Sequence, residues 1–179
     1  MSRAIHVSVA PSVPALALDT VWFQVAGTLC NLRCRHCFIS CGPTNRSHDY
    51  MTRDSVRAHL RDAEELGVRD VYFTGGEPFL HKELAGILED TLRVAPASVL
   101  TNATLVTPRL ARELAALDAE SPYSLEMRVS LDGLTPETND PIRGEGTFAK
   151  AMRGVIKLVE HGFMPIITAA RTWPDERDA

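Results

Sequence analysis

The chain lacks the features that mark membrane-spanning and nucleic-acid-binding proteins. No apolar run in its 179 residues approaches the ~20 residues that a membrane-spanning helix needs. Lysine occurs only three times, no block of basic residues is present, and the formal net charge is −4. A basic surface for nucleic acid or anionic lipid is therefore not indicated, and we expect neither a nucleic acid nor a membrane as a partner.

Cysteine is also scarce, and its four copies are confined to residues 30–41. Two unstrained disulfides are not expected in so short a segment. We therefore expect reduced thiols and a cytoplasmic protein. Residues 1–20 contain Arg3 as their only basic residue and no small-residue cleavage site, so we interpret them as a lead-in and not as a signal peptide.

Three of the cysteines, Cys30, Cys34 and Cys37, form a C-x3-C-x2-C motif. Thiolates with this spacing can hold three corners of a four-iron cluster. The fourth iron is then open to bind and activate a substrate, as the open position of a catalytic zinc does. A structural zinc site is the alternative, with Cys41 or a nearby histidine as the fourth ligand. The spacing alone leaves both hypotheses open.

Strand and helix signals alternate along the rest of the chain. Strands are predicted over residues 21–25, 68–73, 98–101, 124–130 and 166–168. Helices are predicted from Thr52 to Gly67, over 84–92, from Pro108 to Leu117 and from Thr147 to Gly162. This order predicts one α/β domain over residues 21–170, with about five parallel strands and outer helices.

Polar motifs follow the predicted strands at the points where the strands end. The cysteine loop follows the first strand, Gly75-Gly76-Glu77-Pro78 the second, Asn102 the third and Ser130-Leu131-Asp132-Gly133 the fourth. Each motif alone is common in turns. Because the carboxyl ends of parallel strands share one edge, we expect these groups to form one ligand site.

In this order, the cysteine loop, the Gly-Gly-Glu-Pro segment and the Ser-Leu-Asp-Gly segment resemble the three best-known motifs of the radical S-adenosylmethionine (SAM) superfamily, over roughly residues 20–170. Residues 34–37 and 142–148 resemble the branch whose members often carry an additional iron–sulfur (SPASM or twitch) domain. The resemblance implies a partial TIM-like (β/α) barrel of six strands. Five are predicted here, so the core looks C-terminally truncated, with residues 171–179 as a truncated tail.

The resemblance also implies a set of ligands. Cys30, Cys34 and Cys37 would bind a [4Fe-4S] cluster whose open iron chelates SAM. Eight further residues would bind SAM: His36, Gly75, Gly76, Glu77, Asn102, Ser130, Asp132 and Arg143. A fourth thiol, Cys41, departs from the family pattern, and we expect it not to be a ligand.

Each implied SAM contact has a chemical reason. The Glu77 carboxylate suits the methionine ammonium, and Gly75 and Gly76 allow close backbone approach. Ser130 and Asp132 would bind the ribose hydroxyls.

The other implied contacts are peripheral to that core. A bidentate Arg143 suits the carboxylate of SAM. Asn102 would contact the ligand from the third loop, and His36 lies where an aromatic residue often meets adenine.

The implied activity is reductive cleavage of SAM to a 5′-deoxyadenosyl radical, which abstracts hydrogen from a peptide or a cofactor or haem precursor. Such an enzyme needs a one-electron reductant such as flavodoxin or ferredoxin. A partner chain that completes the barrel is the other partner that we expect here. The alternative is a truncated, non-catalytic iron–sulfur and SAM-binding accessory fragment.

Overall fold

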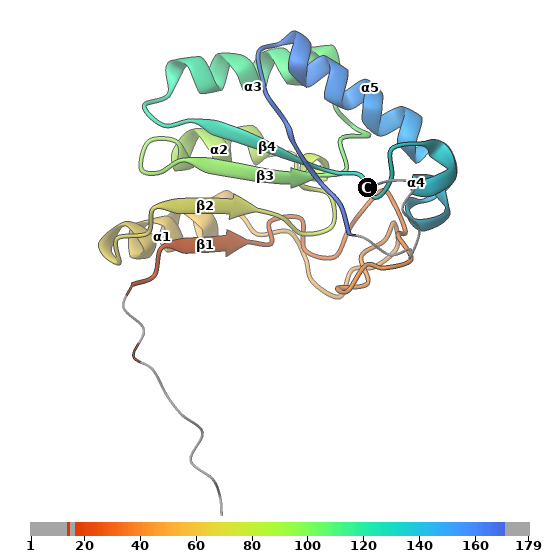
Figure 1. Cartoon of the computed structure of the whole chain (residues 1–179). Coiled ribbons are helices and arrows are strands. Elements are labelled where there is room, and N and C mark those ends of the chain that lie inside the picture. Colours follow the sequence, from red (N-terminus) through yellow and green to blue (C-terminus); the bar gives the residue numbers. More distant parts are fainter. Residues whose placement is uncertain (1–13, 15–16, 171–179) are drawn as a thin grey trace, which may run out of the picture.

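The computed structural model describes residue 14 and residues 17–170. Its centre is a parallel sheet with strand order β1-β2-β3-β4-β5, the order of the chain itself (Figure 1). The strands are β1 Thr20–Phe23, β2 Asp70–Phe73, β3 Ala97–Thr101, β4 Leu125–Ser130 and β5 Ile166–Thr168. Consecutive parallel pairing is how a β/α barrel closes, so the prediction of a partial barrel with five parallel strands is confirmed.

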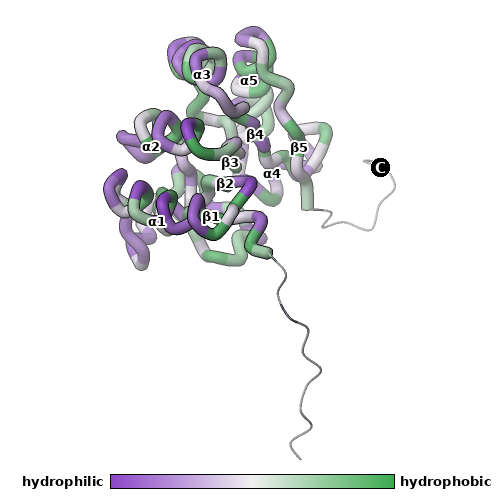
Figure 2. Tube along the Cα trace, turned by 90° about the vertical axis from the view of Figure 1, so that its left-hand side faces the viewer, coloured by the Kyte–Doolittle hydropathy of each residue, from purple (hydrophilic) through white to green (hydrophobic). Residues whose placement is uncertain are grey.

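Four of the helices lie along the outer side of the curved sheet (Figure 2). They are α1 Arg53–Glu65, α2 Leu84–Thr91, α3 Pro108–Glu120 and α5 Thr147–Glu160. Two predicted helix starts have the expected capping bonds. The Thr52 hydroxyl accepts from the Ser55 N–H at 3.1 Å, and the Thr107 hydroxyl accepts from the Leu110 N–H at 3.1 Å, with Pro108 in the first turn.

A further helix, α4 Pro136–Arg143, follows β4 and was not predicted. It begins as α3 does, with a threonine before a proline, but Pro141 lies inside it and no apolar stripe marks it. Its Asp140 caps α5: the carboxylate accepts from the N–H groups of Gly146 at 2.7 Å and Phe148 at 2.8 Å. A short 3₁₀ turn, Pro78–Leu80, follows β2.

The core lies between the sheet and the outer helices, and alternation along the strands decides which side chains enter it. Phe23, Phe73 and Met127 are at most 4% exposed. Trp22, which precedes Phe23 on β1, points to the opposite face and is 55% exposed. Phe23 is therefore part of the core, whereas Trp22 lies outside it.

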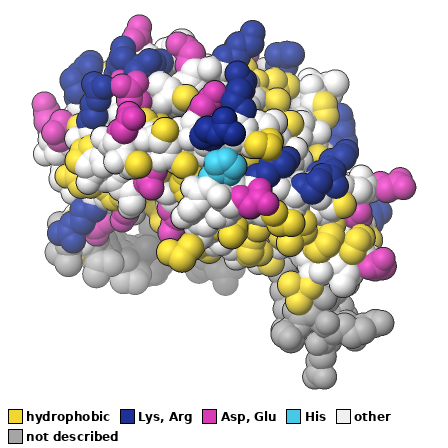
Figure 3. Space-filling model, turned by 90° about the horizontal axis from the view of Figure 1, so that it is seen from above, with side chains coloured by type: hydrophobic (Ala, Val, Ile, Leu, Met, Phe, Trp, Pro, Cys, Tyr) yellow, Lys and Arg dark blue, Asp and Glu magenta, His cyan; other side chains and the backbone are white. Residues whose placement is uncertain are grey.

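The outer surface over α3 and α5 mixes acidic and basic side chains with hydrophobic ones (Figure 3). Among the described residues, no helix is long and apolar enough to cross a membrane.

Candidate functional site

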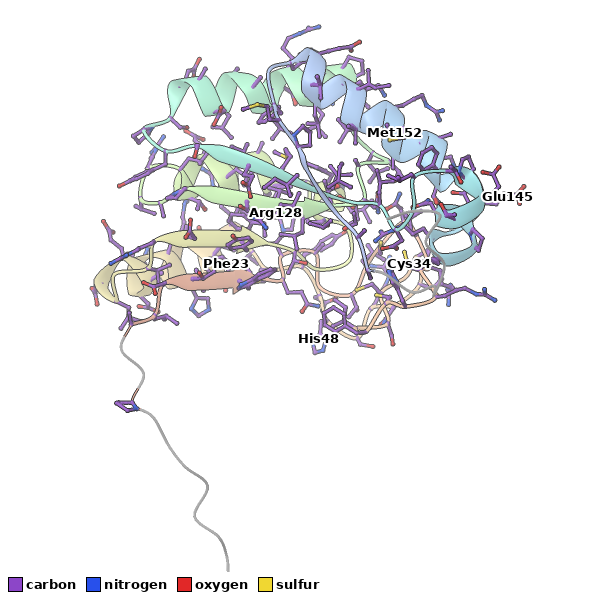
Figure 4. The ribbon with its side chains drawn as sticks, in the orientation of Figure 1. Phe23, Cys34, His48, Arg128, Glu145 and Met152 are labelled. Carbon is purple, nitrogen blue, oxygen red and sulfur yellow. The ribbon has the colours of Figure 1, made fainter. Side chains whose placement is uncertain are left out.

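The cysteine loop lies at the carboxyl end of β1, beside α4, and Cys34 projects within this region (Figure 4). A short backbone clasp joins the two ends of the loop. The Cys30 N–H donates to the Gly42 carbonyl at 3.2 Å, and the Gly42 N–H donates to the Thr28 carbonyl at 3.1 Å. A third backbone bond, from Arg35 to Ile142 at 2.8 Å, fixes the middle of the loop to α4.

All four cysteines in the loop are free thiols, and Cys30 and Cys41 are buried. Burial raises the pKa of Cys30 to about 11 and that of Cys41 to about 12, and it also raises the pKa of Cys34. Sulfur atoms already accept backbone N–H groups: Leu32 donates to Cys30 at 3.4 Å, and Cys41 donates to Cys37 at 3.2 Å.

The ligand geometry bears on the choice between zinc and iron. Within residues 17–170, no three His, Cys, Asp or Glu side chains converge closely enough to hold one metal ion. A four-coordinate zinc site needs that convergence. A cluster binds each thiolate through a different iron atom, so it does not require the three sulfurs to meet at one point.

Glu77 is 1% exposed and joins the loops after β2 and β3. Its Oε1 accepts from the Thr101 hydroxyl at 2.7 Å and the Phe79 N–H at 3.2 Å, and its Oε2 accepts from the Asn102 N–H at 2.8 Å. Burial raises its pKa, against the effect of these donors. A carboxylate has about four acceptor positions, so the three bonds leave one for a cationic group.

The two glycines before Glu77 have no room for a side chain. A Cβ on Gly76 would collide with the Leu29 carbonyl oxygen and lie 2.8 Å from the Cys30 nitrogen. One on Gly75, whose φ is +134°, would lie 2.9 Å from the Ala26 nitrogen. The β2 loop therefore packs backbone against backbone on the cysteine loop, and the Glu77 N–H donates to the Leu29 carbonyl at 3.1 Å.

Three of the predicted SAM-binding residues meet at Asp132. Asp132 is fully buried, and its Oδ2 lies 2.6 Å from Arg143 Nε and 2.8 Å from His36 Nε2. Among described residues, His36 Nδ1 is buried without a hydrogen-bond partner, whereas Asp132 Oδ2 and Arg143 Nε pair with each other. Buried polar atoms usually have a partner, so this ring nitrogen is available to a polar ligand.

Ser130 and Asn102 differ in their availability. Within the described part of the chain the Ser130 hydroxyl makes no hydrogen bond, so it is free for a ligand. The Asn102 side chain is 7% exposed and bonds to Asn31, Thr104 and Cys30. The structure thus brings all eleven predicted site residues to one edge of the sheet. The side chain of Asn102, however, is already hydrogen-bonded to other protein groups.

Sequence reasoning missed several residues that shape this site. Thr101 holds Glu77, and Asn31 and Thr104 hold Asn102. Asn139 on α4 is fully buried, and its Oδ1 accepts from the Asp132 N–H at 3.1 Å. The sequence signal for Thr101 and Thr104 was their place at the end of β3. Asn139 gave none, because its helix was not predicted.

Comparisons with known proteins agree with this geometry. The profile of the radical SAM superfamily matches residues 25–174. The chain is 34% identical over 145 residues to a probable GTP 3′,8-cyclase of Methanosarcina mazei, covering 76% of this chain and 41% of that protein. It is 33% identical over 135 residues to the mycofactocin maturase MftC of Mycobacterium tuberculosis, covering 75% and 33%.

Two solved structures share the fold. Native anSMEcpe with bound AdoMet superposes with a TM-score of 0.70 at 21% identity, covering 85% of this chain and 43% of that one. Streptococcus suis SuiB bound to S-adenosylmethionine gives 0.72 at 22% identity, covering 89% and 35%. The chain spans between 33% and 43% of the length of these four proteins.

Proposed function

This chain belongs to the radical SAM superfamily, and we propose from that premise that it binds a [4Fe-4S] cluster and SAM and supports radical chemistry on a peptide or a cofactor precursor. When bound, the cluster and SAM supply one-electron reductive cleavage of the S–C5′ bond and a 5′-deoxyadenosyl radical that takes hydrogen from the substrate. The observation that carries the proposal is the gathering of three thiols and two buried carboxylates, Glu77 and Asp132, at one edge of the sheet.

Cys30, Cys34 and Cys37 would hold the cluster, since each is a thiol on one loop that backbone bonds close and fix to α4. Cys41 lies within the same loop, and its N–H donates to the Cys37 sulfur at 3.2 Å. This bond suits Cys41 to orienting a ligand through its backbone, so we assign it no ligand role.

Glu77 would take the ammonium of SAM at its remaining acceptor position, while Gly75 and Gly76 let the backbone approach. An ammonium beside this buried carboxyl would favour its ionised form and offset the effect of burial on its pKa. Protein donors already orient the carboxylate, so little conformational entropy is lost when SAM binds.

The group of side chains around Asp132 would bind the rest of SAM. Ser130 and Asp132 would take the ribose hydroxyls, and Arg143 the carboxylate. His36 Nδ1 would lie near the adenine. Arg143 and His36 both contact Asp132 Oδ2, which holds the three side chains in register before a ligand arrives.

A peptide substrate is supported by relatives, since SuiB has been solved bound to precursor peptide SuiA and anSMEcpe with a bound Cp18Cys peptide. A small precursor is supported by the likeness to a GTP 3′,8-cyclase. We propose that flavodoxin or ferredoxin supplies the electron and that the protein works in the reducing cytoplasm.

Anaerobic reconstitution tests the proposal. We expect about four irons per chain, a brown chromophore and 5′-deoxyadenosine from SAM under a strong one-electron reductant. Replacing Cys34 by alanine (Cys34→Ala) should remove the cluster, whereas Cys41→Ala should keep the iron and nearly all SAM cleavage.

Other outcomes have definite meanings. Full iron content in Cys34→Ala, or stable zinc without a chromophore in the wild type, would overturn the proposal. Iron and SAM bound without cleavage would favour the accessory fragment, an alternative raised by the short span of the chain relative to its relatives.

A further inference from the structure

We infer that Asn102 is a positioning residue for the cluster, donating a side-chain N–H to the sulfur of Cys30, and not the SAM contact that the family resemblance implies. This inference rests on the proposed function, because it concerns how this chain tunes a bound cluster. It follows from a closed ring of hydrogen bonds that joins the cysteine loop to the loop after β3.

The orientation of the Asn102 amide is fixed by a backbone group. The Thr104 N–H lies 3.0 Å from Asn102 Oδ1, and a backbone N–H can only donate. The atom on that side must therefore be the oxygen, and the NH₂ group must face the cysteine loop. The Thr104 hydroxyl donates to the same oxygen at 2.6 Å.

The remaining bonds close the ring with consistent directions. Asn102 Nδ2 donates to Asn31 Oδ1 at 2.9 Å, and Asn31 Nδ2 donates to the Thr104 hydroxyl at 2.8 Å. The Thr104 hydroxyl then donates back to Asn102 Oδ1. Each member donates and accepts once around the ring, so rotating any one amide would place two donors or two acceptors face to face.

The second amide hydrogen of Asn102 is left over from the ring and has one partner. Asn102 Nδ2 lies 3.9 Å from Cys30 Sγ, and both residues are buried, with exposed fractions of 7% and 8%. The Leu32 N–H approaches the same sulfur at 3.4 Å. With Oδ1 and Nδ2 both occupied in this way, Asn102 has no polar side-chain atom left for SAM.

An N–H directed at a ligand sulfur affects a cluster in a known direction. Such donors stabilise the more negative, reduced state and raise the reduction potential. The effect is stronger in a buried site, where solvent screens it less. Asn102 should therefore make the cluster easier to reduce. Asn31 and Thr104 should keep the Asn102 amide directed at the Cys30 sulfur.

The test is the reduction potential of the reconstituted cluster, measured by anaerobic redox titration with EPR detection of the reduced state. Asn102→Asp keeps the acceptor for Thr104 but replaces the donor with a carboxylate, so its potential should shift to a clearly more negative value. Thr104→Val opens the ring, and a smaller shift in the same direction is expected. Thr104→Ser keeps the hydroxyl and serves as the matched control, with the wild-type potential.

SAM affinity separates the two roles of Asn102. In Thr104→Val with its cluster intact, SAM should bind with unchanged affinity if Asn102 acts on the sulfur. Unchanged potentials in Asn102→Asp and Thr104→Val, or a tenfold loss of SAM affinity in Thr104→Val at an unchanged potential, would overturn the inference.

If Asn102→Asp assembles no cluster, Thr104→Val alone decides the question. A wild-type chain that binds a cluster but does not cleave SAM would sink the enzyme proposal and leave the comparison of potentials decisive. A wild-type chain without any cluster would overturn both.

Discussion

Asp90 on α2 shows how single residues fasten the outer helices to one another. Its carboxylate accepts from Arg53 at 2.6 and 2.8 Å and from Arg57 at 2.7 and 3.2 Å, two bidentate contacts from α1. The hydrogen bonds from Arg53 are the main cause that lowers its pKa to about 2, and burial opposes them. The fork geometry of arginine suits this shared carboxylate.

Asp90→Asn should therefore lower the free energy of unfolding by about 1 kcal/mol, a value reduced for solvent screening of partly exposed arginines. Because the folded pKa lies below the unfolded one, this stabilisation is complete above the unfolded value of ~3.9 and is lost as the pH falls through about 2. Urea unfolding of both proteins between neutral and acidic pH should show the difference vanish at the acidic end.

The matched control is Asp54→Asn. Asp54 also contacts Arg57, at 3.4 Å, but its side chain is 92% exposed, so the same substitution should leave stability unchanged. A destabilisation of Asp90→Asn that persists unchanged through acid pH would contradict this account of the two arginines.

At the scale of elements, the contact between the cysteine loop and the loop after β2 depends on a missing side chain. Gly76→Ala would push a methyl group into the Leu29 carbonyl and the Cys30 N–H, both of which are backbone. We expect a loss of about 1–3 kcal/mol of stability, as for other overpacked sites, and poor retention of iron after reconstitution.

Gly42→Ala is the control within the same loop. Its Cβ would meet only the Arg33 side chain, at 3.7 Å or more, so stability and iron content should match the wild type. If thermal unfolding and iron analysis gave the two variants the same values, backbone packing would not be what excludes a side chain from position 76.

Elements also show what the sequence can and cannot predict here. The strands and outer helices were predicted because apolar periodicity and capping pairs such as Thr107 and Pro108 act locally. The helix α4 was missed because Pro141 and its polar residues hide the pattern. The order of the motifs predicted that the site residues lie at one edge of the sheet. The partners of Asn102 could not be predicted in this way, because they lie up to 72 positions away and only the fold brings them together.

At the scale of the whole molecule, apolar surface gathers around β5, the last strand of the sheet. Five apolar side chains there are each at least 40% exposed: Ile156, Val159, Met164, Ile166 and Ile167. Beside them is a cavity of about 310 Å³, lined mainly by apolar residues of α5, β5 and the loop after β4. In the described part of the chain no strand pairs with the outer edge of β5, and an open apolar edge favours association.

We therefore predict concentration-dependent self-association of the 179-residue chain. Ile167→Lys places a charge in this surface and should raise the dissociation constant at least tenfold, about 1.4 kcal/mol, as measured by sedimentation velocity. Leu66→Lys at the end of α1 is the control, because Leu66 is also exposed, at 63%, but lies beside the first strands. A chain that stays monomeric at high concentration would refute this prediction.

The clasp between Leu29 and Gly42 has one more consequence, for how the metal centre is assembled. Cys41 and the three cysteines proposed as cluster ligands lie within the single loop that it closes. Such a loop can open as a local unit while the sheet stays folded. Iron delivery would then need this loop to open, including its bond from Arg35 to Ile142. Hydrogen exchange at the amides of Cys30 and Gly42 should slow once the cluster is bound.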